Sequence, residues 1–572
     1  MTPPLRLVSI LAALGGVLAQ SEADNDRAKS SSKVWAAVAF VNHGEITPAL
    51  GYSPSLLTPQ GAQQMHRQGA AFRQRYLTTP DSASNSSTSS PMQNIERDAI
   101  DNRAINVLSK SETWASSCAL AFLQGLYPPN TKAFANYVGG EALAEDYPAN
   151  GTFSYPLDGY QYPGIKTPSE ADSVSVSFQG DQGCRSWNDA SGKTVGSDPA
   201  VKDKASASNE FYQHLFSTAP LQGTVDPSMA DFAHAHDIYQ LVNYLYTHNE
   251  TVYKGLEDAP KTLQTLREYA FALQSAQTQA SSSNSNDTQS VVKTLPGRTL
   301  AHAVAVQLED FVVRGDFASK MTLMFGSYEP LMAFFSVAGL LTRDNVENGP
   351  MGNVTASGAT IVFELIGENS EDLNSIPGTE DLRVRFLYSP TADKDAELEV
   401  YSLFGSGFDG NSIPYTAFLR EMKSRGRDAV DWCELCNPEG GSTWCSSTSS
   451  ATHEAKSRMN PAVAGVIGAI IMGGLVSLVG LGLFCIGGYG IHRNRSGERF
   501  KGPEKRPGDR DVQVGNEGDH QERIGSWEMR DGHAAKASGG DAPASTDHQR
   551  NPFDDDYASD IGAAPVKARE SV

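Results

Sequence analysis

The sequence has little positive charge for its size. Its 572 residues carry 46 Lys and Arg against 67 Asp and Glu, which gives a formal net charge of −21 at pH 7. Nucleic acids and anionic membrane surfaces attract basic proteins, so this balance argues against either of them as the main partner. We therefore expect no nucleic-acid function.

Cysteine is also scarce, with six residues in the chain. Cys485 lies in a long apolar run, and the other five are Cys118, Cys184, Cys433, Cys436 and Cys445. An odd number in an oxidising compartment leaves at least one thiol free or intermolecular. The spacing of Cys433 and Cys436 is compatible with zinc or redox chemistry, but the pair stands alone and a structural disulfide is the favoured interpretation. We expect neither a metal nor a cofactor.

Both ends of the chain carry signals of the secretory route. Residues 1–19 place Arg6 before an apolar run that ends in small residues, which is typical of a signal peptide. Residues 461–490 hold no charge and exceed the roughly 20 residues that span a bilayer. Basic residues follow from Arg493, so the C-terminus should be cytoplasmic. The sequence predicts a type I single-pass membrane protein of the cell surface, endosome or vacuole.

Five Asn-x-Ser/Thr sites precede the predicted span, and they predict a glycosylated surface: Asn85, Asn150, Asn249, Asn286 and Asn353. Residues 438–460 form a Ser/Thr-rich stalk. Small residues recur every four positions within the span and favour a homodimer through it: Gly465, Ala469, Gly473 and Ser477.

The tail, residues 491–572, is rich in charged and small residues and poor in large apolar ones, so we expect it to be disordered. It contains a short motif that resembles the NPFxD endocytic sorting signal of fungi: Asn551, Pro552, Phe553, Asp554 and Asp555. The resemblance implies an endocytic adaptor as partner.

One apolar stretch organises the folded part. Residues 34–41 are apolar and partly β-branched, and the run stops abruptly at His43-Gly44. This pattern predicts a buried strand of a parallel sheet. Chemistry in such sheets lies beyond the carboxyl ends of the strands, where Gly44 would let the backbone approach a ligand closely. His43 is therefore the first candidate site residue.

The stretch from Asn42 to Pro48 resembles the Arg-His-Gly-x-Arg-x-Pro signature of the histidine acid phosphatases, the family that includes phytases. In that family the histidine attacks phosphorus and becomes a phosphohistidine, and both arginines clamp the phosphate. His43 and Gly44 match, but Asn42 and Ile46 stand at the two arginine positions, and Glu45 lies between them.

The resemblance continues along the chain. Thr58, as N-cap, and Pro59 open a helix like the one that follows the family's catalytic loop. A strand over 105–108 and a helix over 112–126 resemble the unit that supplies a third phosphate-binding arginine. Trp114 stands at its position, and the nearest cations, Lys110 and Arg103, do not fit it.

The family's distal His-Asp pair is also replaced. A predicted strand over 321–325 is followed by Gly326, as in the family, but Ser327 and Tyr328 stand where the His and Asp bind phosphate and protonate the leaving group. Glu329 is the only acid nearby in the sequence. It can act as the proton donor or simply favour the start of the next helix, and the second role is preferred.

The segment His234-Ala235-His236-Asp237 contains two histidines and an acid, but no third ligand at zinc-like spacing. It resembles part of a cap helix in the fungal branch of the family, where we expect these histidines at the helix surface.

The resemblance implies an ectodomain over residues 20–437 with a three-layer α/β/α core. The core comprises about 33–134 and 290–437, and a mainly α-helical cap over about 135–289 is inserted between them.

Two functional classes remain open. The favoured one is a membrane-anchored protein with little or no phosphatase activity that acts as a surface or endosomal binding or cargo protein for an unknown luminal ligand. The alternative is an active phosphatase that works through a phosphohistidine at His43. The predicted pocket residues around His43 are Asn42, Gly44, Glu45, Ile46, Trp114, Ser327 and Tyr328, with Glu329 as the candidate acid.

Overall fold

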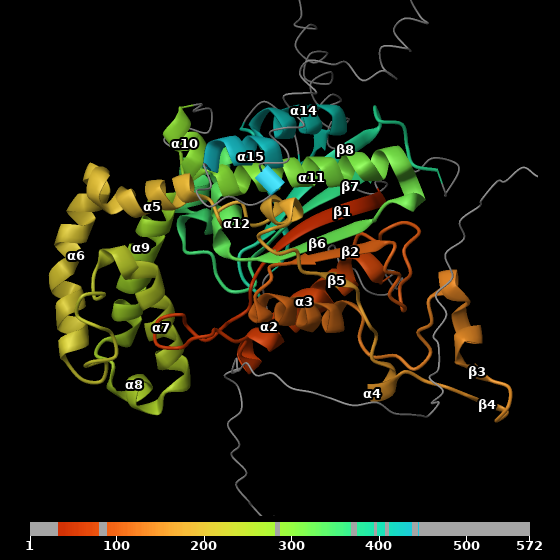
Figure 1. Cartoon of the computed structure of the whole chain (residues 1–572), viewed down its shortest axis with the longest axis horizontal. Helices are drawn as coiled ribbons and strands as arrows, with labels where there is room; N and C mark the ends of the chain where they lie inside the picture. Colours follow the sequence, from red (N-terminus) through yellow and green to blue (C-terminus); the bar gives the residue numbers. More distant parts are fainter. Residues whose placement is uncertain are drawn as a thin grey trace, which may run out of the picture. The chain divides into compact units, whose positions relative to one another are not determined.

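A mixed β-sheet forms the centre of the fold (Figure 1). Its strand order is β10-β8-β7-β1-β6-β2-β5, and β9 pairs with β8. The central strand β1 (Lys33–Asn42) runs parallel to β6 (Met321–Gly326), which runs parallel to β2 (Ile105–Ser109). On its other side β1 is antiparallel to β7 (Thr360–Gly367), so β1 lies in a mixed sheet and not in the parallel sheet that was predicted. The remaining strands of this sheet are β5 (Ile165–Lys166), β8 (Leu382–Ser389), β9 (Glu399–Val400) and β10 (Ile413–Pro414).

The computed structural model describes residues 33–78, 89–280, 287–367, 375–393, 397–405, 411–436 and 444–445. No helix within these ranges is long and apolar enough to cross a membrane. The predicted signal peptide, span and tail with its sorting motif lie outside the described residues, as do Asn85 and Asn286. The other three predicted glycosylation sites are exposed: Asn150, Asn249 and Asn353.

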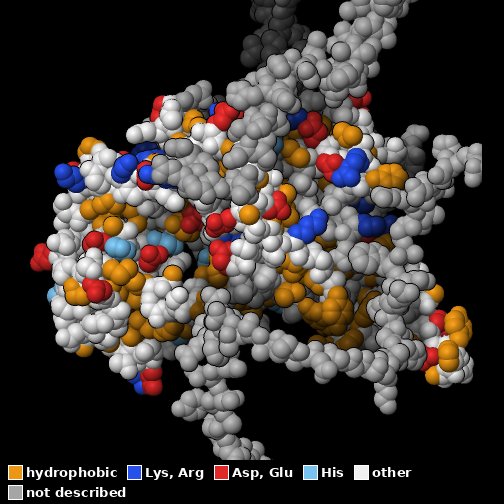
Figure 2. Space-filling model, in the orientation of Figure 1, with side chains coloured by type: hydrophobic (Ala, Val, Ile, Leu, Met, Phe, Trp, Pro, Cys, Tyr) orange, Lys and Arg blue, Asp and Glu red, His pale blue; other side chains and the backbone are white. Residues whose placement is uncertain are grey.

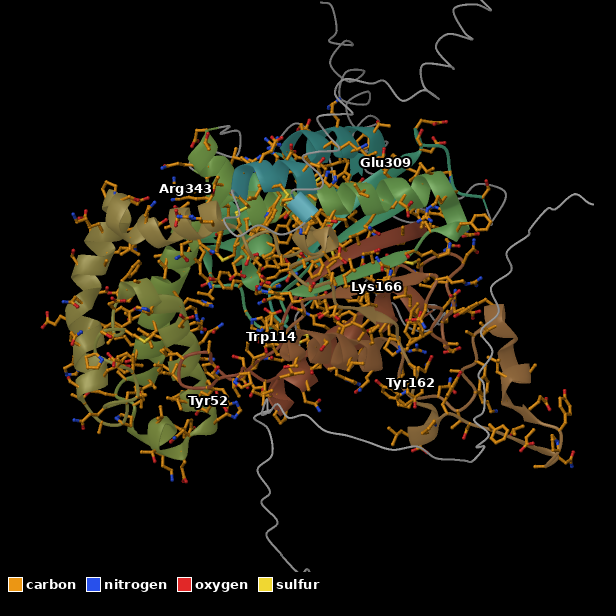
Figure 3. All side chains as sticks on the ribbon, in the orientation of Figure 1. Tyr52, Trp114, Tyr162, Lys166, Glu309 and Arg343 are labelled. Carbon is orange, nitrogen blue, oxygen red and sulfur yellow. A yellow bond between two sulfur atoms is a disulfide. The ribbon has the colours of Figure 1, made fainter. Side chains whose placement is uncertain are left out.

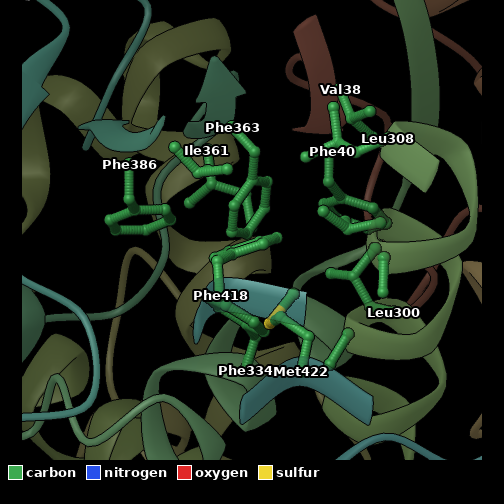
Figure 4. Close-up of a cluster of buried hydrophobic side chains, with 14 of the residues drawn as sticks. Val38, Phe40, Leu300, Leu308, Phe334, Ile361, Phe363, Phe386, Phe418 and Met422 are labelled. Atoms are coloured by element: carbon green, nitrogen blue, oxygen red, sulfur yellow. The ribbon is translucent and has the colours of Figure 1, made fainter. Parts of the chain in front are cut away.

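Helices cover both faces of the sheet. On one face α2 (Pro59–Phe72) and α3 (Thr113–Leu126) pack on Val34, Ala37, Ala39 and Val41 of β1. On the other face lie α11 (Leu295–Arg314), α12 (Tyr328–Val337) and α14 (Tyr415–Arg425). Figure 4 shows this second core, where Val38 and Phe40 lie near Leu300 and Leu308. Burial on both faces explains why β1 is an unbroken apolar run.

A helical unit with its own hydrophobic core forms the cap (Figure 1). Its helices are α5 (Arg185–Ser197), α6 (Pro199–Ser217), α7 (Ala235–His248), α8 (Glu250–Gly255), α9 (Ala259–Thr278) and α10 (Thr288–Lys293). The helical part thus begins at Arg185, about fifty residues later than the cap boundary expected from the sequence. The preceding stretch is irregular, and within it β5 joins the core sheet beside β2.

That irregular stretch carries a small hairpin, β3 (Glu145–Asp146) and β4 (Gly151–Thr152), and the short α4 (Pro156–Gly159). Exposed apolar side chains gather there, among them Tyr147 and Phe153 (Figure 2). Two further α-helices are α13 (Arg343–Glu347) and α15 (Ala429–Cys436).

Two disulfides occur in the described chain, and one of them ties its C-terminal end to its middle. Cys184 pairs with Cys436 across 252 residues, and Cys433 pairs with Cys445. Cys433 and Cys436 are therefore both structural, as expected, but each has a partner outside the Cys-x-x-Cys pair. Cys118 is free and buried, and burial raises the pKa of its thiol to about 12.

Candidate active site

A cavity of about 460 Å³ opens where the carboxyl end of β1 meets the cap. Asn42, His43, Glu45 and Ile46 line it from the core, and His236, Tyr239 and Arg267 line it from the cap helices. Trp114, at the start of α3, lies where the core faces the cap (Figure 3). The edge of the sheet expected to carry the chemistry is therefore the one that holds the cavity.

The loop after β1 is held close to α2. The side chain of Thr58 caps this helix by accepting from the Gly61 backbone N–H, and Pro59 occupies the first turn, as predicted. A Cβ atom built on Gly44 would lie 2.4 Å from the Gly61 carbonyl oxygen. Gly44 is thus required for packing of the loop on α2, and it is not among the residues that line the cavity.

His43 is buried and oriented by its own loop. Its backbone N–H donates to the Gly326 carbonyl at 3.0 Å, which joins it to the end of β6. Its Nδ1 lies 2.7 Å from the Gly44 carbonyl oxygen. Since only N–H can donate to a carbonyl, the neutral ring carries its lone pair on Nε2. Burial lowers the pKa of His43, which keeps the ring neutral.

The three positions that the family fills with arginine carry no charge here. The Asn42 amide donates to the Ala356 carbonyl at 2.9 Å, and its Oδ1 is buried without a partner among the described residues. Ile46 forms a β-bridge with Leu57. Trp114 packs edge-on against His43, with 5.0 Å between the ring centroids.

One cation, Lys110, lies near enough to His43 to act on it, although the sequence comparison did not assign it to an arginine position of the family. Lys110 follows β2 directly, and its backbone N–H donates to the Phe325 carbonyl of β6. Its buried Nζ lies 3.3 Å from Ser327 Oγ and 3.7 Å from Glu112 Oε1. The positional signal was present in the sequence, because Lys110 stands at the carboxyl end of a strand beside β6.

Carboxylates gather at the same place. Glu329 stands at the start of α12, its Oε2 is buried without a partner in the described chain, and its charge acts on His43. Glu329 is the only acid nearby in the sequence, but in the fold Asp181, from the loop before α5, lies near enough for Glu329 to act on it. Burial and then Glu329 raise the pKa of Asp181 to about 7. No local pattern in the sequence points to Asp181.

His236 also belongs to the site, although a surface position was expected. It lines the cavity, and its ring lies 4.6 Å from that of Tyr328. Burial and then His43 lower its pKa to about 3, so it is neutral. His234 does lie near the surface, where its Nδ1 is 2.8 Å from Asp231 Oδ1. No cluster of three metal-binding side chains occurs within the described ranges.

Glu45 connects the site to the cap. Its Oε1 accepts from Thr58 Oγ1 at 2.7 Å and lies 2.8 Å from Nε2 of His248, the last residue of α7. Its charge is thus engaged by neighbours and is not directed at His43.

No protein-family model and no curated protein matches the sequence. Several solved structures are similar to this one. The phytase from Citrobacter braakii shares 12% identity at a TM-score of 0.44, over 69% of this chain and 98% of that chain. The Klebsiella sp. ASR1 phytase shares 13% sequence identity at a TM-score of 0.43, and the match covers 69% of this chain and 95% of that chain. The Bifidobacterium longum multiple inositol polyphosphate phosphatase, in complex with inositol hexasulfate, shares 15% sequence identity at a TM-score of 0.38. The match covers 68% of this chain and 91% of that chain. At these scores the likenesses carry no weight for function.

Proposed function

We propose that this chain is a histidine acid phosphatase-like binding protein that does not turn over phosphomonoesters. The observation that carries the proposal is the charge beside His43. Within the described ranges, Arg267 is the single guanidinium that lines the cavity, and it comes from the cap. The ammonium of Lys110, which acts on His43 in the described chain, already contacts Glu112 and Ser327.

Phosphoryl transfer depends on donors and cations that neutralise the equatorial oxygens. Loss of one such donor costs about 3 kcal/mol of transition-state stabilisation, and here Asn42, Ile46 and Trp114 replace three. Glu329 and Asp181 add repulsion for a phosphate dianion. Unless a phosphate group is held in line beside it, a histidine nucleophile has no phosphorus atom to attack.

The test uses the purified full chain with an aryl phosphate and with phytate, over pH 3 to 8. We expect no hydrolysis above that of a His43→Ala variant, and no phosphohistidine after denaturing quench. Turnover that His43→Ala abolishes would overturn the proposal.

One observation favours the alternative of an active phosphatase. The contact of His43 Nδ1 with Gly44 leaves the Nε2 lone pair available, as a nucleophile requires. If turnover is found, Glu329→Gln should lower the rate most for poor leaving groups, because Glu329 would then protonate them.

We also propose that the chain is a type I membrane protein with luminal glycans and a cytoplasmic tail. The signal-like residues 1–19, the apolar run 461–490 and its basic flank support this. Protease added to sealed vesicles with the cytosolic face outward should remove the tail and spare the ectodomain; the reverse result contradicts the topology.

For the tail, we propose uptake through an endocytic adaptor that reads Asn551-Pro552-Phe553. Phe553→Ala should raise surface abundance by slowing internalisation, because Phe would be the apolar anchor of the motif. The control is Ser559→Ala, a change in the same tail but outside the motif, which should leave uptake as it is. Unchanged uptake of the Phe553 variant contradicts the idea.

A further inference from the structure

We propose that Asn353 carries an N-linked glycan whose first sugars stand at the entrance of the cavity, so that small ligands pass to His43 and bulky ones do not. This inference rests on the proposed luminal glycans, and it assigns to one of them control over access to the site. It is independent of whether His43 turns over a phosphomonoester.

The glycosylation sequence is itself part of the cavity wall. Asn353, Val354 and Thr355 all line the cavity, and Ala356 and Ser357 continue the same wall. Asn353 is exposed, whereas Thr355 is 8% exposed. The wall therefore runs from buried residues to an exposed asparagine, which places Asn353 at the rim of the cavity.

Two hydrogen bonds fix this wall to the segment that carries His43. The Asn42 amide donates to the Ala356 carbonyl at 2.9 Å, and the Gly358 backbone N–H donates to the His43 carbonyl at 2.9 Å. The wall is thus attached to the end of β1 within a few residues of Asn353. A glycan on Asn353 would start from a fixed point beside the site.

A second hollow adjoins the cavity at this rim. Its volume is about 410 Å³, and apart from Asn353 it is lined by residues of α9: Pro260, Leu263, Gln264, Arg267 and Glu268. Asn353 and Arg267 line both the cavity and this hollow. Any group bonded to the Asn353 amide therefore begins at the boundary between the two.

The α9 hollow has the chemistry that a sugar needs. Its volume lies in the usual range for small-ligand sites. Gln264, Arg267 and Glu268 offer donors and acceptors for hydroxyl and acetamide groups, while Pro260 and Leu263 offer apolar surface for a sugar ring. We expect the first N-acetylglucosamine to lie in this hollow and the bulk of the glycan to cover the entrance.

The other two described glycosylation sites lie elsewhere. Asn150 is in the turn of the β3–β4 hairpin, and Asn249 caps α8, where its Oδ1 accepts from the Thr251 backbone N–H at 2.9 Å. Neither lines the cavity. Asn150 therefore serves as the matched control for removal of a glycan.

The experiment measures how fast thiol reagents of two sizes reach the cavity wall in the full chain, made in a eukaryotic secretory host. Ser357→Cys supplies the thiol, and the same chain without this change supplies the background from the native cysteines. N-ethylmaleimide is the small reagent and fluorescein maleimide the bulky one. We expect Asn353→Gln to raise the bulky rate at least fivefold and to leave the small rate within twofold.

Two further variants make the test specific. Thr355→Val removes the glycosylation sequence but keeps Asn353, and should match Asn353→Gln. Asn150→Gln should leave both rates within twofold. Unfolding curves of all variants confirm folding. An unchanged bulky rate in Asn353→Gln, an equal gain for both reagents, or an equal gain in Asn150→Gln would overturn the inference.

Mass spectrometry of glycopeptides separates this inference from the proposal on which it rests. We expect a glycan on Asn353 as well as on Asn150 and Asn249. Glycans on the latter two with none on Asn353 reject this inference alone. Absence of glycans from all three rejects the proposed luminal glycans themselves.

Discussion

Two groups of buried charge lie along the same sheet, and they differ in how completely they are paired. On β7, Glu364 accepts from Arg75 Nε at 2.6 Å, from the Tyr76 hydroxyl at 2.7 Å and from Arg385 Nε at 2.7 Å. After β2, Lys110 Nζ lies 3.7 Å from Glu112 Oε1 and its charge opposes Asp181, and oxygens of Glu112, Asp181 and Glu329 have no donor in the described structure.

The pKa directions reflect this difference. Burial alone would raise the pKa of Glu364, but the guanidinium groups of Arg75 and Arg385 outweigh it and the pKa lies below its usual value. At Asp181 burial and Glu329 prevail over Lys110, and the pKa rises to about 7. A fully paired network stabilises the fold, whereas a partly paired one lowers its stability.

The largest effect should follow from breaking the paired network. Glu364→Ala removes the acceptor that two guanidinium groups and a tyrosine hydroxyl share, and we expect a loss of about 3–5 kcal/mol in the free energy of unfolding. Urea unfolding at pH 7 measures it. The control is Glu347→Ala, which removes the exposed pair with Arg343 and should cost less than about 1 kcal/mol. Similar losses in both variants would contradict the structural role of Glu364.

Replacing Asp181 should raise the free energy of unfolding, which is the opposite of the effect expected at Glu364. Its pKa in the folded protein, about 7, lies above its usual 3.8, so the folded state binds a proton more tightly than the unfolded chain between these values. Its contribution to stability therefore falls as the pH rises from about 4 through 7. Asp181→Asn should be more stable than wild type by about 2–4 kcal/mol at pH 8, with little difference near pH 4. A pH-independent difference between the two unfolding curves would show that the carboxyl group is not destabilised.

The local elements around the site could be predicted from the sequence, but the polar partners of His43 could not. The strand β1, the cap of α2 by Thr58 and the place of His43 follow from local patterns: an apolar run, a capping residue before proline, a turn after a strand. The cavity at the end of β1 follows from the general rule for such sheets.

The polar residues around His43 could not be predicted from local patterns, because packing brings them together from distant segments of the chain. Asp181 arrives from an irregular loop, and His236 arrives on a cap helix whose rotation no local pattern fixes. The pairing of Cys184 with Cys436 spans 252 residues. Lys110 could have been predicted as a site residue, because it stands just after a predicted strand. The comparison with the family pointed to Trp114 instead.

Lys110 is the single ammonium that opposes Asp181 within the described site. Its removal should widen the difference between this partly paired group and the fully paired network of Glu364. Lys110→Met keeps the length of the side chain and removes the charge, so at pH 8 we expect a loss of about 1–3 kcal/mol in the free energy of unfolding. At pH 5 the loss should be smaller, because Asp181 is then protonated. Unfolding in urea at both pH values tests this. An equal loss at both would mean that Lys110 stabilises by packing of its stem and not by its charge.

The smallest effect should come from the contact between loop and cap. Glu45 Oε1 accepts from Thr58 Oγ1 in the core and lies 2.8 Å from His248 Nε2 in the cap. Because the His248 side chain is one-third exposed, His248→Ala should cost less than about 1 kcal/mol in the free energy of unfolding. Thr58→Ala should cost about 1 kcal/mol, since it also removes the N-cap of α2. A larger loss for His248→Ala than for Thr58→Ala would mean that the cap, and not α2, holds the loop that follows His43.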